Sequence, residues 1–139
     1  MGIIDDLVQK GRLKNATISD EMVKKEFEIG KKDYSSAVAS FDSSNFKWAT
    51  IQAYYAIFHA ARALLYRCGY REESHAALKL ALKELYITNG KLPRSVYDTL
   101  ERGMDLREMA DYKENYSQKG AENLILAVKD AIAEIEKLI

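Results

Sequence analysis

The hydrophobic pattern is most distinctive over residues 48–68, which read WATIQAYYAIFHAARALLYRC. The run is long enough for a helix and carries almost no charge, so it predicts a helix inside the protein. Small and large side chains recur on two faces at steps of three and four. The small face holds Ala49, Ala53, Ala56, Ala60 and Ala63, and the large face holds Ile51, Tyr55, Phe58, Arg62 and Leu65. Because an alanine face lets a neighbour approach closely, we expect this helix to be sandwiched between others.

A third row on the same predicted helix carries polar groups at the tips of its side chains. It repeats the three-four spacing and consists of Gln52, Tyr55, His59, Arg62 and Tyr66. Such a row is either a network of satisfied hydrogen bonds in the core or part of a binding site. We interpret His59 as a hydrogen-bonded core histidine, with a role as base or ligand as the alternative.

The rest of the chain also has helical spacing, and residues that favour helix ends divide it. We expect a short helix over residues 3–14, a second from the caps Thr17 or Ser19 to a turn at 42–45, and an end to the buried helix at Gly69. Further helices are expected from Ser74 to Asn89-Gly90, from Pro93 in its first turn to about Tyr112, and from Ser117 onward. No alternation typical of strands competes.

These elements predict an all-α protein, an up-and-down helical bundle of about five to six helices around a four-helix-bundle core. We expect one domain over residues 1–139, with a short N-terminal helix and turn over 1–18 and the bundle over 19–139. For a homodimer, the alanine face or the last helix is the expected two-fold contact.

Composition narrows the class of protein further. The chain has 21 basic and 21 acidic residues, so no strong field favours nucleic acid or a membrane surface. It has one cysteine, Cys68, for which we expect a packed thiol, and no apolar run of membrane-spanning length. A soluble, cytoplasmic protein without membrane contact is predicted.

Most catalytic signatures are missing from the chain. There is no glycine-rich phosphate loop, no paired-cysteine spacing and no His-Glu-x-x-His helix, so we expect no cofactor and no metal site. The two histidines are His59 and His75. Since His75 directly follows the cap Ser74, we expect it to be a solvated residue of the first turn.

The predicted fifth helix contains a second unusual pattern. Its apolar seam includes a glycine and an arginine, in the order Val96, Leu100, Gly103, Arg107 and Ala110. A glycine inside a helix costs about 1 kcal/mol relative to alanine, so Gly103 is expected to allow a close contact. Asp111 can form an ion pair with Arg107 four residues earlier, and we expect both residues to be more buried than charged residues usually are. The pair is either an architectural tie or the anion-binding part of a site.

Two blocks of this sequence resemble the HEPN superfamily, in its small prokaryotic and archaeal branch. They are AYYAIFHAARALL at 53–65, followed by a glycine turn, and LREMADY at 106–112. The resemblance covers about residues 20–138 and implies a helical bundle, commonly dimeric, that binds nucleotides or RNA. Many relatives are toxins encoded beside a minimal nucleotidyltransferase that serves as antitoxin. Active members are metal-independent ribonucleases with an arginine and a histidine four to six residues apart on a late helix, and two subunits form one site.

The chain departs from that ribonuclease pattern at the decisive position. If Arg107 is the family's arginine, Tyr112 stands where the nearest allowed histidine would be, and no histidine follows His75. Without a group that titrates near neutrality, proton transfer to and from the RNA is lost. His59 can replace the histidine only if its ring faces Arg107.

We therefore expect a binding module with a degenerate ribonuclease motif rather than an enzyme. The expected ligand is a nucleotide, RNA or a partner protein. We expect the chain to form a homodimer and to have a nucleotidyltransferase as its partner protein. Two alternatives remain open: a metal-independent ribonuclease that pairs Arg107 with His59, and a structural dimer without a small ligand. The expected binding residues are Tyr55, His59, Arg62, Arg107, Asp111 and Tyr112.

Overall fold

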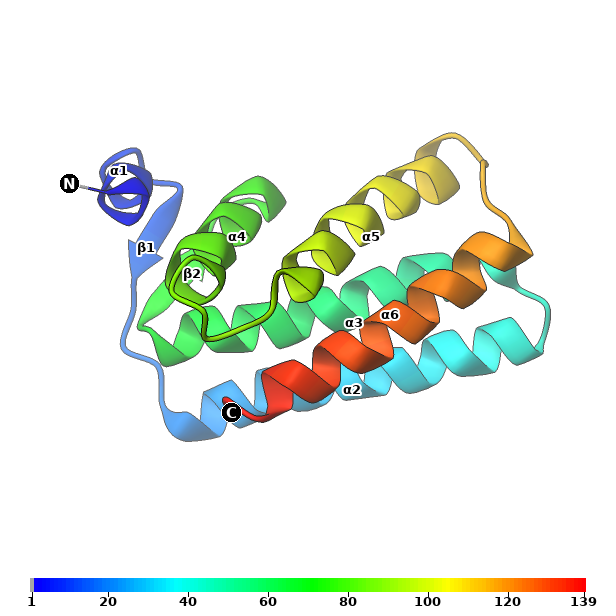
Figure 1. Ribbon diagram of the computed structural model, residues 1–139, viewed down its shortest axis with the longest axis horizontal. Coiled ribbons are helices and arrows are strands. Elements are labelled where there is room, and N and C mark those ends of the chain that lie inside the picture. Colours follow the sequence, from blue (N-terminus) through cyan, green and yellow to red (C-terminus); the bar gives the residue numbers. More distant parts are fainter. Residues whose placement is uncertain (1) are drawn as a thin grey trace.

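The computed structural model describes residues 2–139, so Met1, the first residue of the expected domain, lies outside them. Four long helices alternate in direction along the molecule (Figure 1), which confirms the all-α bundle. They are α2 (Asp20–Asp42), α3 (Phe46–Arg67), α5 (Arg94–Tyr112) and α6 (Gln118–Glu136). The shorter elements are α1 (Ile3–Gln9), β1 (Leu13–Asn15), β2 (Tyr70–Glu72), α4 (His75–Leu82) and the π-helical turn η1 (Lys83–Ile87).

Helix α3 is the centre of the fold and packs against α2, α4, α5 and α6. Its five-alanine face is completely buried, and α2 approaches it at Gly30, where a Cβ would stand 2.7 Å from the carbonyl oxygen of Ala56. The prediction of a buried, sandwiched helix is confirmed. The same burial excludes the alanine face as a two-fold contact, because the chain's own helices already cover it.

Side-chain caps start four of the helices. Ser19, Asn45, Ser74 and Ser117 each accept a hydrogen bond from the backbone N–H three residues later. The three predicted serine caps are confirmed, and Gly69 follows α3 with the expected positive φ of 82°. Pro93 is one position earlier than expected, at the N-cap of α5.

The N-terminal segment differs from the prediction. Its helix ends at Gln9 instead of continuing to residue 14, and Gly11 turns the chain with a φ of 72°. The strand β1 then pairs antiparallel with β2, with Lys14 opposite Arg71. A three-residue strand is too short to show alternation, and its partner is distant in sequence, so the expectation of no strand was wrong.

Cys68 is exposed, so the expected packed thiol was also wrong. It is the C-cap of α3, where the helix leaves the core, and its Sγ lies 3.2 Å from the hydroxyl oxygen of Tyr86. That hydroxyl donates to the carbonyl oxygen of Leu64 at 2.8 Å. Within residues 2–139, every helix is too short or too polar to cross a membrane.

Candidate functional site

Arg107 lies against the aromatic surface of α3. Its Cζ is 5.6 Å from the ring centre of Tyr54, 5.9 Å from that of Tyr55 and 5.5 Å from that of Tyr112. Its Nη1 also donates to the Tyr112 hydroxyl at 3.3 Å. A guanidinium near tyrosine rings is attracted by their electron-rich faces. Three rings therefore hold the Arg107 side chain in place, and only 12% of it is exposed.

Gly103 makes this contact between α5 and α3 feasible. A Cβ at residue 103 would stand 3.2 Å from Cδ1 of Tyr54, which is tighter than an ordinary van der Waals contact. Tyr54 itself is completely buried. The expectation that Gly103 allows a close helix contact is confirmed, and it brings Arg107, one turn later, to the tyrosines.

The expected ion pair with Asp111 is looser than predicted. Nη1 of Arg107 is 3.7 Å from a carboxylate oxygen of Asp111, and the Asp111 side chain is 38% exposed. Arg107 is more buried than charged residues usually are, as expected, but Asp111 is more exposed, because it lies one turn closer to the end of α5. The Nε of Arg107 is buried and has no hydrogen-bond partner among the described residues. The fold therefore compensates the charge of Arg107 only weakly.

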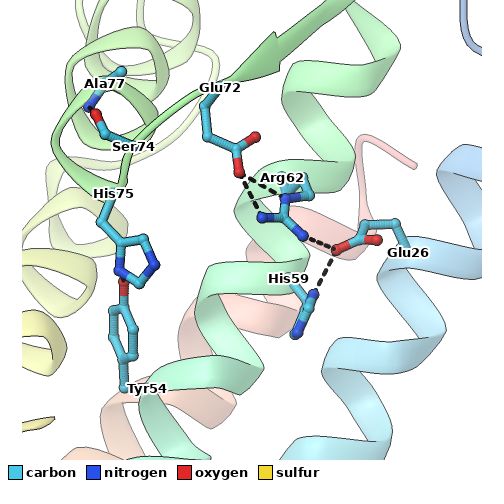
Figure 2. Close-up of polar contacts among 8 residues, drawn as sticks. All are labelled: Glu26, Tyr54, His59, Arg62, Glu72, Ser74, His75 and Ala77. Carbon is cyan, nitrogen blue, oxygen red and sulfur yellow. Dashed lines mark hydrogen bonds and ion pairs between the residues drawn. The ribbon is translucent and has the colours of Figure 1, made fainter. Parts of the chain in front are cut away.

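His75 is a residue of this site that sequence reasoning missed. Instead of being solvated, it is half-buried, and its Nδ1 lies 2.7 Å from the hydroxyl oxygen of Tyr54 (Figure 2). Its ring centre is 4.5 Å from that of Phe58 and 6.4 Å from that of Tyr55. The cap Ser74 indicated only where α4 begins. Which way the next side chain points depends on how α4 packs against α3.

The surroundings of His75 favour its neutral form. Burial lowers the pKa of its imidazole, and the positive charges of Arg107 and Arg62 lower it further. Arg107 and His75 thus influence each other, although they come from different helices. We call Tyr54, Tyr55, His75, Arg107 and Tyr112 the Arg107 cluster.

His59 and Arg62 belong to a second network, between α2, α3 and β2 (Figure 2). His59 contacts Glu26 through Nδ1 at 2.5 Å and Asp33 through Nε2 at 3.6 Å. Arg62 pairs with Glu72 at 2.6 Å and with Glu26 at 3.5 Å. The interpretation of His59 as a hydrogen-bonded core histidine is confirmed. Carboxylates occupy both of its ring nitrogens and compensate Arg62, so this network is unsuited to an anion.

The structure therefore divides the six residues predicted to bind a ligand. Tyr55, Arg107 and Tyr112 lie together, with Asp111 at their edge, and are joined by the unpredicted Tyr54 and His75. His59 and Arg62 lie in the neighbouring network. Phe58 connects the two, because its ring is 4.5 Å from the Arg62 guanidinium and 4.5 Å from the His75 ring.

The cavity between α5 and α6 is separate from the Arg107 cluster. Across residues 2–139, no three His, Cys, Asp or Glu side chains are arranged to hold a metal ion. A cavity of about 550 Å³ lies between α5 and α6, lined by small residues such as Thr99 and Ala131. Neither Arg107 nor His75 lines it.

Comparison with known proteins identifies the family of the chain. Residues 23–138 match the model of the HEPN domain. A protein of Methanocaldococcus jannaschii named "Putative toxin MJ0605" is 29% identical over 114 residues, which cover 81% of this chain and 84% of that protein. Because the family model spans most of the chain, from the first turn of α2 to the end of α6, the protein belongs to the HEPN family.

Proposed function

We propose that this HEPN protein is a toxin-type module that binds the phosphate group of a nucleotide or RNA at the Arg107 cluster. The state of Arg107 carries the proposal. It is a cation held by three tyrosine rings, its contact to Asp111 is 3.7 Å long, and its Nε is unpaired in the described chain. A guanidinium fixed in this way keeps donors for a phosphate, which arginine binds through two parallel hydrogen bonds.

The aromatic residues support a nucleotide rather than a bare anion. The side chain of Tyr112 is beside Arg107, and the residue is 72% exposed. Unpaired bases stack on aromatic rings, while the adjacent phosphate binds an arginine. The toxin role rests on the name of the archaeal relative and on the family to which the chain belongs.

The second candidate function is a metal-independent ribonuclease, and the position of His75 favours it. The motif expected on α5 lacks a histidine, but His75 of α4 and Arg107 both contact Tyr54. This ribonuclease would pair Arg107 with His75, and not with His59, whose ring nitrogens face Glu26 and Asp33. It requires His75 to accept or release a proton during cleavage.

Partners are part of the same proposal. We expect a second copy of the chain and a minimal nucleotidyltransferase that acts as antitoxin, as the family resemblance implies. A structural dimer without a small ligand is the remaining alternative, because satisfied tyrosine contacts alone can hold Arg107. Coexpression of the two proteins followed by copurification tests the nucleotidyltransferase.

The binding experiment is a titration of a labelled single-stranded RNA oligomer and of adenine nucleotides. Arg107→Ala should weaken binding by about 10-fold or more, since hydrogen bonds to charged groups contribute about 1.5–3 kcal/mol. Arg94→Ala is the matched control, because Arg94 is on the same helix and 65% of its side chain is exposed. Wild-type binding should also weaken as salt rises. Equal affinity of wild type and Arg107→Ala would contradict the proposal.

A further inference from the structure

The hydrogen bond between Tyr54 and His75 determines which ring nitrogen carries the proton. Tyr54 is completely buried, and the one hydrogen-bond partner of its hydroxyl among the described residues is Nδ1 of His75. A buried hydroxyl proton needs an acceptor, so the phenol donates and Nδ1 accepts. Burial also raises the pKa of Tyr54 strongly, which keeps the phenol protonated. In neutral His75 the proton is therefore on Nε2.

We propose that Tyr54 fixes this tautomer so that the Nε2–H of His75 is a second hydrogen-bond donor for the phosphate bound by Arg107. His75 is then a binding residue and Tyr54 a positioning residue that acts through it. This inference rests on the proposed phosphate-binding function. It also decides between the two candidates, because a protonated Nε2 has no lone pair with which to take a proton from a ribose hydroxyl.

Charged groups on three elements influence the pKa of His75, and their net effect together with burial favours the neutral imidazole. Arg62 of α3 and Arg107 of α5 lower its pKa, while Glu72 of β2 and Glu108 of α5 raise it by less than burial and the arginines lower it. A second proton would have to be placed on Nδ1, opposite the hydroxyl proton of Tyr54. That arrangement would leave a buried donor without an acceptor.

The fold places both donors close to the ring of Tyr54. The His75 ring centre lies 5.7 Å and the Arg107 Cζ 5.6 Å from the ring centre of Tyr54. An ion pair of 3.1 Å between Lys79 and Glu101 ties α4 to α5. In Figure 1, the two helices that carry these donors, α4 and α5, follow one another along the edge of α3 opposite α2. Hydrogen-bond donors that are already positioned before binding can contact several oxygens of a phosphate group without a further ordering cost.

The tautomer can be measured directly, because the chain has only two histidines. Two-bond ¹H–¹⁵N correlation spectra distinguish the Nε2–H form, the Nδ1–H form and the imidazolium, and His59→Gln assigns the signals. We expect His75 to be the Nε2–H form at pH 7. In Tyr54→Phe, which keeps the ring but removes the hydroxyl, the two neutral forms should mix.

Binding completes the test, with inorganic phosphate, AMP and a single-stranded RNA oligomer as probes. The three probes distinguish a free phosphate, a nucleotide and a polymer as the source of the group. His75→Ala should weaken binding by about tenfold, and His75→Gln, which keeps an N–H donor, should recover part of the loss. Tyr54→Phe should weaken binding as well, although Tyr54 is completely buried. Thermal melts verify that each variant is folded.

The outcomes separate this inference from the function on which it rests. If Arg107→Ala loses binding while His75→Ala binds like wild type, the inference fails and the proposed function stands. An Nδ1–H form or an imidazolium at pH 7, or RNA cleavage that disappears in His75→Ala, also overturns the inference. If wild type binds none of the three probes, the proposed function and the inference fail together.

Discussion

Gly30 of α2 faces the backbone of α3 so closely that a Cβ at this residue would stand 2.7 Å from the carbonyl oxygen of Ala56. The obstacle is a backbone atom of a buried helix, which cannot move without shifting the core. This contact sets the distance between α2 and α3, and so the position of the network that contains His59.

Gly30→Ala should lower the free energy of unfolding by about 1–3 kcal/mol, the usual cost of overpacking a core. Gly103→Ala is the matched comparison, because its Cβ would meet a side-chain atom of Tyr54 at 3.2 Å. We expect it to cost less, since a side chain can shift more easily than a backbone; the gain of about 1 kcal/mol from alanine in a helix applies to both variants. Urea denaturation measures both, and equal costs would contradict the argument.

Asp111→Ala should change the free energy of unfolding by only about 0–1 kcal/mol, as for a surface ion pair. The half-exposed carboxylate and its 3.7 Å contact to Arg107 are the reason. Arg107→Ala should cost more, because it removes the contacts to three tyrosine rings. A cost near 3–5 kcal/mol for Asp111→Ala, as for a broken buried pair, would show that the pair is closed in solution.

Glu72→Gln should destabilise the fold, because it removes one of the two carboxylates that compensate Arg62. The Glu72 side chain is 5% exposed, so the cost should approach the 3–5 kcal/mol of a buried pair broken from one side. Because the Arg62 side chain is 26% exposed, water can solvate part of its unpaired charge, and the cost should be correspondingly smaller. Asp98→Asn, in an exposed pair with Arg94, is the control and should cost about 0–1 kcal/mol. If the two variants unfold at the same urea midpoint, the predicted difference between the buried and the exposed pair is wrong.

Lowering the pH should destabilise wild type through His75. Its pKa in the folded protein is below the usual value of 6.5, so the unfolded chain takes up the proton first. The contribution of neutral His75 to the stability of the fold is therefore fully present above pH 6.5, and it is lost as pH falls through the lowered pKa. His75→Gln should lack this part of the pH dependence between pH 7 and 5, while carboxylates such as Asp33 titrate equally in both proteins. Parallel stability curves would argue against a lowered pKa.

Light scattering should give about twice the chain mass of 15.8 kDa, the mass expected of a homodimer. With the alanine face buried, the last helix is the remaining expected contact, and Leu126 on α6 is 57% exposed. Leu126→Glu should then shift the protein toward the monomer, whereas Ile3→Glu, at a 47% exposed position on α1, should not. A wild type that is monomeric at micromolar concentration would disprove the dimer.

Much of the fold was predictable because its signals are local. The caps Ser19 and Ser117 and the alanine face of α3 are properties of neighbouring residues, and helices depend on such neighbours. The seam position of Arg107 and the role of Gly103 followed from the same periodicity. Sequence alone thus determined the class of fold, the buried helix and the position of Arg107 on a helix seam.

Only the tertiary structure decided what surrounds that arginine. Tyr54 and His75 are 21 residues apart, and Glu26 and His59 are 33 apart. Their contacts depend on how α4 and α2 pack against α3, which no local pattern encodes. The paired residues of β1 and β2 are still farther apart in sequence. A side chain at a helix terminus, such as His75, is solvated or buried according to the neighbour it meets, and packing alone selects that neighbour.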